Sequence, residues 1–327
     1  MLKDKTLGQL LEDPRIAPIA PEAISKWDLS KEEFYRWTLQ QIADRMGWRN
    51  LESGFIRLFE AADRGEYYYK LYTEEERKAD SAKESANIVH FPSSDPAADG
   101  RPFILLVPGG GFVNVWNLTE GWPVARIFNE LGYHVFILTY RVKTDGAAVL
   151  AMEDMARALR IIASRKDEFR VRPESYITCG FSTGGYLVCL WNTEKGYPAF
   201  GLPKPRACFP VYPVTSYRLM DAEEWDEGEN KDAFARAGVG CTMQEACESC
   251  FEIPQHVEGF PPTAIFATAQ DQLVDPEHSR ALARALEKIG IPCRLEIGPT
   301  GGHGFADGAG MCMEGWPKRA VEWYERL

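Results

Sequence analysis

Apolar residues form short, nearly uninterrupted runs along the chain from about residue 100 onward. The runs are Phe103–Val107, Val135–Tyr140, Tyr176–Cys179, Ala207–Val211, Thr263–Thr268 and Cys293–Ile297. Runs of this length without polar alternation are typical of parallel strands that are buried on both faces. The last run is an exception, because Arg294 and Glu296 alternate with its apolar residues, and we therefore expect it near an edge of the sheet.

Helical stretches separate these runs and complete an alternating pattern of strands and helices. They are expected at residues 119–131, 147–165, 184–194, 276–289 and 315–326. Such alternation predicts an α/β fold, in which a mostly parallel central sheet is flanked by helices.

Two regions depart from this rhythm. Residues 1–80 are expected to be helical, with one helix over Leu29–Met46 that begins in a capping box of Ser30 and Glu33, and with Tyr67–Tyr72 continuing the pattern. Residues 214–260 are interpreted as an insertion over the sheet. We therefore expect an N-terminal helical segment, residues 1–80, and a main domain, residues 81–327, with both extra regions covering its functional site.

Composition and charge exclude several classes of protein. Apolar residues make up 45% of the chain and charged residues 26%, which is ordinary for a globular protein. The net charge of −11 disfavours binding to nucleic acid or to anionic lipid. No run approaches the roughly 18 apolar residues of a membrane span, and no secretory signal is recognisable. We expect a cytoplasmic protein that acts on a neutral or cationic small molecule.

Three of the eight cysteines lie close together in the insertion. Cys241 is followed by Cys247 and Cys250, and the last two form a CxxC pair. A zinc site needs a fourth ligand at tight spacing, and His256 is the only nearby candidate. We expect free thiols here, with metal or redox chemistry as the less favoured alternative, and neither a metal nor a cofactor elsewhere.

The residues Gly180-Phe181-Ser182-Thr183-Gly184 form a GxSxG pattern between a strand-like run and a helical stretch. A sharp strand–turn–helix lifts the serine hydroxyl above the sheet, and the helix N-terminus directs N–H groups at developing negative charge. Ser182 is therefore a candidate nucleophile. The alternative is a glycine-rich turn in which the serine is incidental.

A serine nucleophile needs a base. Of the five histidines, His303 lies in a glycine-flanked loop directly after the last apolar run, where the end of a strand could bring it to the serine. A buried acid should then orient the imidazole. Asp271 and Asp275 compete for this role, but Asp275 precedes Pro276 and fits a helix N-cap, so we choose Asp271.

Acyl transfer also requires hydrogen-bond donors for an oxyanion. The run Phe103–Val107 ends in Pro108-Gly109-Gly110-Gly111-Phe112, and consecutive glycines allow backbone N–H groups to face a ligand. Gly110 and Gly111, with the N–H group of Thr183, are the candidate donors.

Together these motifs resemble a known family. The chain looks like an α/β-hydrolase of the hormone-sensitive-lipase and acetyl-esterase kind, within the group that includes acetyl xylan and feruloyl esterases. The resemblance covers residues 85–327 and rests on PGGGF at 108–112, TEGWPVA at 119–125, TYR at 139–141, GFSTGG at 180–185, FPVYPV at 209–214 and GGHGF at 301–305. It implies a Ser182–His303–Asp271 triad with the 109–111 loop as oxyanion hole.

The resemblance also bears on the substrate. Many members have histidine before the glycines, and the PGGG form here is more like the carbohydrate-esterase branch, which favours sugar esters. We expect a serine esterase that removes short acyl groups, acetyl foremost, because no long apolar gorge is evident, with Trp116 and Phe181 as candidate substrate contacts. An amide or aryl-formamide hydrolase and a non-catalytic binding protein of the same fold remain alternatives.

Overall fold

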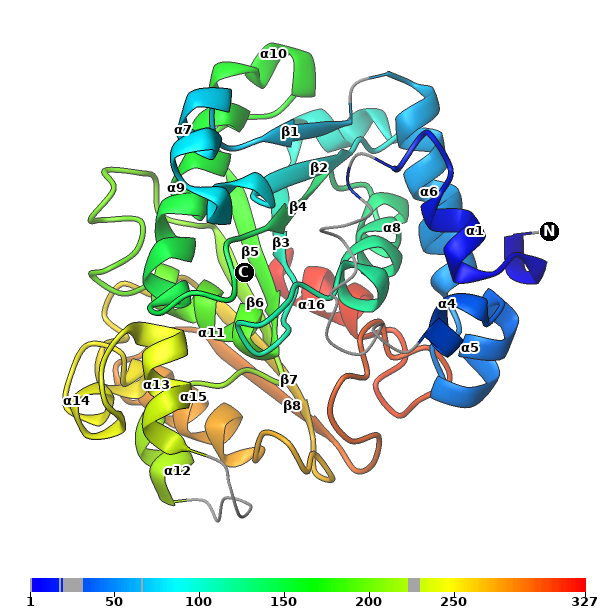
Figure 1. Ribbon diagram of the computed structural model, residues 1–327. Helices are drawn as coiled ribbons and strands as arrows, with labels where there is room; N and C mark the ends of the chain where they lie inside the picture. The colour runs from blue at the N-terminus through cyan, green and yellow to red at the C-terminus, as the bar shows by residue number, and fades with distance from the viewer. Residues whose placement is uncertain (1, 18, 20–31, 66, 223–229) are drawn as a thin grey trace.

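The computed structural model describes residues 2–17, 19, 32–65, 67–222 and 230–327. Within these ranges the core is an eight-stranded sheet with the order β1-β2-β4-β3-β5-β6-β7-β8 (Figure 1). The strands are β1 Tyr68–Lys70, β2 Asn87–Phe91, β3 Phe103–Val107, β4 Val135–Thr139, β5 Tyr176–Phe181, β6 Ala207–Val211, β7 Thr263–Thr268 and β8 Cys293–Gly298. Strands β3 to β8 run parallel, and β1 and β2 pair antiparallel at one side. The predicted fold class is confirmed.

The six apolar runs correspond to β3 to β8, and β8 lies at the sheet edge, as its alternation indicated. Two strands were missed. Tyr67–Tyr72 was expected to be helical, but it contains β1, because tyrosines favour the pleated surface of a strand. β2 carries Asn87 and His90, which interrupt the apolar pattern that marks the other strands.

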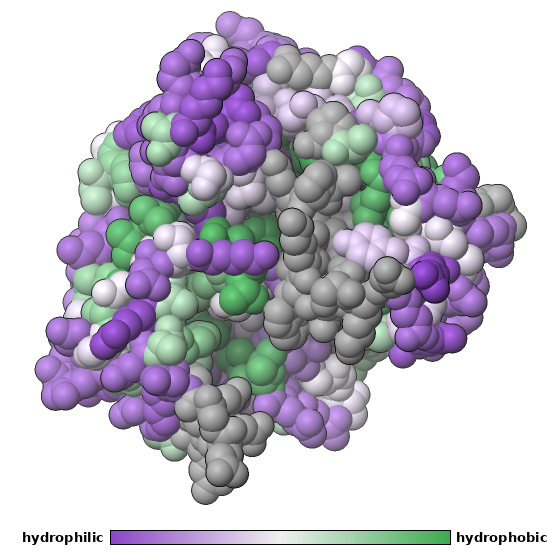
Figure 2. Space-filling model, in the orientation of Figure 1, coloured by the Kyte–Doolittle hydropathy of each residue, from purple (hydrophilic) through white to green (hydrophobic). Residues whose placement is uncertain are grey.

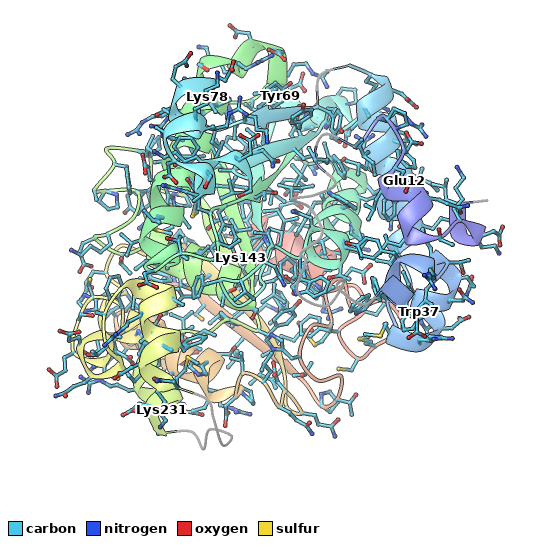
Figure 3. All side chains as sticks on the ribbon, viewed as in Figure 1. Glu12, Trp37, Tyr69, Lys78, Lys143 and Lys231 are labelled. Carbon is cyan, nitrogen blue, oxygen red and sulfur yellow. The ribbon has the colours of Figure 1, made fainter. Side chains whose placement is uncertain are left out.

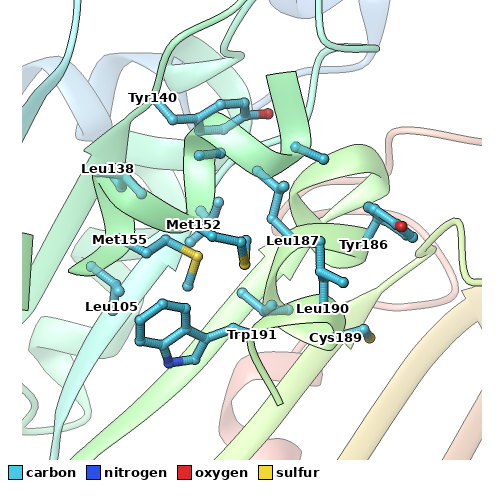
Figure 4. Close-up of a cluster of buried hydrophobic side chains, with 14 of the residues drawn as sticks. Leu105, Leu138, Tyr140, Met152, Met155, Tyr186, Leu187, Cys189, Leu190 and Trp191 are labelled. Carbon is cyan, nitrogen blue, oxygen red and sulfur yellow. The ribbon is translucent and has the colours of Figure 1, made fainter. Parts of the chain in front are cut away.

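Helices cover both faces of the sheet. On one face Leu105 and Leu138 pack against α9 and α11, as Figure 4 shows, and on the other Ile104 and Leu106 pack beneath α8 and α16. The longer helices of the main domain are α8 Trp122–Glu130, α9 Ala147–Ser164, α11 Ser182–Trp191, α15 Glu277–Lys288 and α16 Trp316–Tyr324. The shorter elements are α7 Glu74–Ala79, η2 Ser81–Glu84, η3 Pro96–Gly100, η4 Asn117–Gly121, α10 Lys166–Phe169 and η5 Ile253–Gln255.

The helices of the N-terminal segment are shorter and more numerous than predicted. Its elements are η1 Leu2–Asp4, α1 Leu7–Leu11, α4 Glu32–Arg36, α5 Leu39–Met46 and α6 Leu51–Asp63. A single helix over Leu29–Met46 is wrong, because Thr38 has extended backbone and its hydroxyl caps α5 by accepting the N–H of Gln41 at 3.1 Å. The predicted cap at Ser30 lies outside the described residues. α6 packs against α8, so the segment shares the hydrophobic core on that face.

The insertion forms three short helices beside α9. They are α12 Tyr217–Ala222, α13 Lys231–Val239 and α14 Met243–Cys247, and residues 223–229 between the first two are outside the described residues. α13 packs against α9. Cys241, Cys247 and Cys250 are free thiols. Among the described residues, no group of three or more His, Cys, Asp or Glu side chains could hold a metal ion.

The molecular surface seen in Figure 2 is mostly hydrophilic around its rim, with hydrophobic side chains gathered toward the middle of the face. This middle region lies between α12 to α14 on one side of the ribbon and α4 and α5 on the other (Figure 1). Within the described ranges, no helix has the length and apolar character needed to cross a membrane.

Candidate active site

Ser182 stands at the junction of β5 and α11, at the middle of the sheet. Its φ of +51° lies in the left-handed region, which is unfavourable for a residue with a side chain and is typical of strained functional turns. The flanking glycines make this turn possible. A Cβ on Gly180 would lie 2.3 Å from the Gly184 carbonyl oxygen, and one on Gly184 would lie 2.2 Å from the Val107 carbonyl oxygen.

The fold brings His303 and Asp271 to this serine from separate loops. Nε2 of His303 lies 3.0 Å from the Ser182 Oγ, and Nδ1 of the same ring lies 2.7 Å from Asp271 Oδ2. The other Asp271 oxygen accepts the N–H groups of Leu273 and Val274 at 3.0 and 2.9 Å. The Asp271 side chain is only 1% exposed, so these hydrogen bonds supply the stabilisation that water does not.

This line of hydrogen bonds allows the serine hydroxyl to be deprotonated. A carboxylate that accepts Nδ1–H leaves Nε2 as the acceptor facing the serine, so the imidazole can take the hydroxyl proton and the carboxylate can stabilise the imidazolium that results. Ser182, His303 and Asp271 therefore have the geometry of a nucleophile, a base and the acid that orients it.

The competing residues have other partners. Asp275 Oδ1 accepts the N–H of Glu277, the first residue of α15, at 2.7 Å, although the N-cap of this helix is Pro276 and not Asp275 as predicted. Of the other histidines, Nδ1 of His134 accepts the N–H of Ser93, and Nδ1 of His278 accepts the N–H of Thr215.

The glycine loop after β3 lies against the serine because β3 is the neighbour of β5, with Val107 paired to Gly180. Gly110 has a φ of +134° and its carbonyl accepts the N–H groups of Val113 and Asn114, which closes the loop into a tight turn. The N–H of Gly111 donates to the Thr183 hydroxyl at 3.1 Å. The three predicted oxyanion donors are thus gathered beside Ser182, and an oxyanion there would compete with the Thr183 hydroxyl for the Gly111 N–H.

A cavity of about 380 Å³ opens beside Ser182 and His303. Its size lies within the range of small-molecule sites. Its apolar wall is contributed by Trp48, Val113, Trp116, Val214, Met220, Phe234, Leu273 and Val274. Trp116, a predicted substrate contact, is therefore part of the wall, together with residues from the N-terminal segment and from the insertion.

Phe181, the other predicted substrate contact, lies elsewhere. Its side chain is fully buried and packs against Tyr212 and Trp316, with ring centroids 5.7 and 5.9 Å away, and it is not part of the cavity wall. It shares the strand face of Ile177 and Cys179, on the side of the sheet that α16 covers. We therefore do not retain Phe181 as a substrate contact. Because side chains two residues apart in a strand share a face, the sequence could have placed Phe181 with Cys179 and Ile177 in the core.

Two wall residues were not anticipated from the sequence. Trp48 precedes the resembling region, and no local motif marks it. Glu120 falls inside the TEGWPVA stretch, but its carboxylate reaches the site only through the fold: Oε2 accepts the N–H of Gly109 at 2.6 Å, and Oε1 accepts the hydroxyl of Tyr212 at 2.9 Å. Burial raises the pKa of Glu120, and these two hydrogen bonds oppose the shift.

The electrostatic character of the cavity follows from its lining. Among the described residues of the wall, Glu120 and His303 are the ionisable groups, and no lysine or arginine contributes. A wall of this kind favours an uncharged group, because nothing there would compensate the desolvation of an anion.

Comparison with known proteins identifies the family of the chain. A family model described as the alpha/beta hydrolase fold matches residues 104–307, which is more than half of the chain. The chain belongs to this family. The matched region contains the glycine loop, Ser182, Asp271 and His303, whereas Trp48 and the rest of the N-terminal segment precede it.

Individual relatives of this α/β-hydrolase are distant. The chain is 27% identical over 229 residues to an acetylxylan esterase of Xylanibacter ruminicola, covering 68% of this chain and 44% of the relative. It is 24% identical over 225 residues to an endo-1,4-β-xylanase B of Butyrivibrio fibrisolvens, covering 66% of this chain and 34% of the relative. The match therefore spans less than half the length of each of these curated relatives.

Solved structures show the same fold. A bifunctional acetyl ester-xyloside hydrolase from Caldicellulosiruptor lactoaceticus matches with a TM-score of 0.61 and 25% identity, over 74% of this chain and 88% of the other. An esterase from Thermogutta terrifontis matches with a TM-score of 0.59 and 21% identity, over 74% and 89% of the two chains.

Proposed function

We propose that this α/β-hydrolase is a serine esterase that hydrolyses short-chain acyl esters, acetyl esters among them. The observation that carries the proposal is the hydrogen-bonded line from Asp271 through His303 to Ser182 at the edge of an apolar cavity. Support also comes from the resemblance to an acetylxylan esterase and to an acetyl ester-xyloside hydrolase.

In the proposed mechanism, Ser182 attacks the ester carbonyl while its proton passes to Nε2 of His303. The tetrahedral oxyanion is held by the N–H groups of Gly110, Gly111 and Thr183. Imidazolium then protonates the departing alcohol, an acyl-Ser182 remains, and water activated by the same imidazole releases the acid and restores the serine. The reaction needs no cofactor.

The alcohol part of the substrate is proposed to be a sugar, such as a xylo-oligosaccharide. The names of the two relatives point in this direction, and Trp116 offers an aromatic surface at the cavity. The acyl part is less constrained than the sequence suggested, because an acetyl group would fill only a small part of about 380 Å³. Hydrolysis rates for p-nitrophenyl esters from C2 to C12, measured beside acetylated xylo-oligosaccharides, would define both parts.

The decisive experiment is the Ser182→Ala variant. We expect kcat on p-nitrophenyl acetate to fall by a factor on the order of 10⁴, with no loss of folding, and a fluorophosphonate probe to label the unaltered protein but not the variant. Asp271→Asn should lower kcat by a similar factor, whereas the matched change Asp275→Asn should not. Full activity of Ser182→Ala would refute the proposal.

A further inference from the structure

Glu120 has an unusual position for a carboxylate. It lies in the π-helical turn η4, is 5% exposed, and faces the same cavity as Ser182 and His303. Burying a carboxylate is costly unless donors surround it, and an apolar side chain would fill this place without that cost. The two hydrogen bonds that Glu120 accepts therefore indicate what it does.

The first bond holds the glycine loop. The Gly109 N–H points to Glu120 Oε2, and Gly109 itself is pressed against the serine, since a Cβ there would lie 2.9 Å from the Ser182 Cβ and 2.6 Å from the Phe181 carbonyl oxygen. The hydrogen bond from the Gly109 N–H to Glu120 holds the start of the loop that carries two of the proposed oxyanion donors, Gly110 and Gly111.

The second bond reaches the histidine loop. The Tyr212 hydroxyl donates to Glu120 Oε1 and accepts the N–H of Ala306 at 3.2 Å. The Tyr212 ring also packs against the imidazole of His303, with centroids 4.8 Å apart. Ala306 and His303 belong to one loop, so the direction of donation runs from that loop through Tyr212 to Glu120.

We propose that Glu120 is a positioning residue that joins the oxyanion loop to the loop of His303, so that the two halves of the active site keep one relative geometry. This rests on the proposed esterase function. The Ser182–His303 hydrogen bond closes a ring that runs on through Ala306, Tyr212 and Glu120 to Gly109, and back to the serine. In the proposed mechanism, Ser182 and His303 are the members of this ring that react with the substrate, and Glu120 acts only by holding them in place.

The test uses Glu120→Gln, which keeps the size but not the charge, and Tyr212→Phe, which keeps the ring but not the hydroxyl. Misplaced catalytic groups lower kcat more than they change KM, and we expect Glu120→Gln to lower kcat on p-nitrophenyl acetate by a factor on the order of 10 to 100. We expect the same split for Tyr212→Phe, a lower kcat with KM nearly unchanged.

A matched control is available on the other face of the sheet. Tyr72 donates its hydroxyl to the buried carboxylate of Asp154, just as Tyr212 does to Glu120. Tyr72→Phe should therefore reduce stability as Tyr212→Phe does, but leave kcat unchanged.

The outcomes separate the two proposals. If Ser182→Ala is inactive but Glu120→Gln and Tyr212→Phe keep the kcat and KM of the unaltered protein, the role of Glu120 is overturned and the esterase function stands. If Ser182→Ala keeps full activity, the proposed function itself fails. Should Glu120→Gln not fold, Tyr212→Phe against Tyr72→Phe decides the matter alone.

Discussion

The indole of Trp48 meets the indole of Trp116 edge to face, with ring centroids 5.9 Å apart. The two residues come from different parts of the molecule, since Trp48 lies between α5 and α6 and Trp116 belongs to the loop after β3. Next to Trp48, the Asn50 side chain donates to Asp307, in the loop that follows His303. The N-terminal segment therefore packs directly against the loops of the candidate site.

The first prediction concerns this aromatic pair. In Trp48→Ala, kcat/KM for p-nitrophenyl esters of C6 to C8 acids should fall roughly tenfold, which corresponds to about 1.4 kcal/mol, while the acetyl ester is affected less. The reason is that a longer acyl group on Ser182 should extend to the cavity wall to which Trp48 contributes, whereas an acetyl group should be too short to do so. Steady-state kinetics across the chain series would check this.

Trp37 supplies the control for that prediction. It belongs to the same segment (Figure 3). There it packs against Phe34 and beneath Arg45, and it is not part of the cavity wall. Trp37→Ala should leave the dependence of rate on acyl length unchanged. An identical change in both variants would mean that the segment acts through stability and not through contact with the substrate.

The second prediction contrasts two adjacent glycines of the oxyanion loop. A Cβ on Gly110 would lie 2.0 Å from the Asn114 Oδ1, whereas the nearest atom to a Cβ on Gly111 is 3.9 Å away. Gly110→Ala must displace the loop and should lower kcat by roughly 10² to 10³, the effect of a lost oxyanion donor.

Gly111→Ala meets only the strain of its φ of +63°, which costs about 1–2 kcal/mol of stability. Its kcat should therefore remain well above that of Gly110→Ala. Kinetics and thermal unfolding of both variants would test the contrast, and equal loss of kcat in the two would contradict it.

The third prediction concerns the dependence of stability on pH. His90 is stacked on Phe136, with ring centroids 4.4 Å apart, and it faces His134, Arg57 and Arg170. Burial, with a further effect of these cationic neighbours, holds the pKa of His90 well below its ordinary value of 6.5. The folded protein therefore keeps this imidazole neutral at pH values where the unfolded chain protonates it.

Because the pKa of the folded state is the lower one, the stabilising effect of neutral His90 is complete above pH 6.5 and is lost as the pH falls below it. The free energy of unfolding should decrease by up to about 1.4 kcal/mol per pH unit from this group. His90→Phe should flatten the curve between pH 6.5 and 5, as measured by urea unfolding. An unchanged slope in the variant would exclude His90 as the source.

The fourth prediction concerns the buried pair of Arg141 and Asp154. Asp154 is fully buried and accepts both the Nε and the backbone N–H of Arg141, at 2.9 and 2.8 Å. Asp154→Ala leaves the guanidinium poorly paired and should lower the free energy of unfolding by about 3 kcal/mol. Glu153→Ala removes a more exposed partner of the same arginine and should cost under about 1 kcal/mol. Chemical denaturation distinguishes them, and similar losses would contradict the argument.

Prediction from local sequence patterns succeeded for those elements whose structure is set by residues close together in the chain. The apolar runs identified β3 to β8, because a strand buried on both faces must be apolar throughout. The glycine pattern around Ser182 indicated the turn, since only glycine tolerates the contacts on either side. The prediction failed at Thr38 and at β1, where a side-chain cap and a sheet edge outweighed the helical spacing of apolar residues.

By itself, the sequence determined the order of strands β3 to β8 and of the helices between them, the turn at Ser182, and the loops from which Asp271 and His303 project. These follow from hydrophobic period, turn chemistry and the rule that parallel strands end at one edge of a sheet. Only the tertiary structure decided that Trp48 lines the cavity, that Phe181 does not, and that Glu120 joins two loops through Tyr212. Such relationships depend on contacts between residues that are distant in the chain, and no local pattern of residues specifies those contacts.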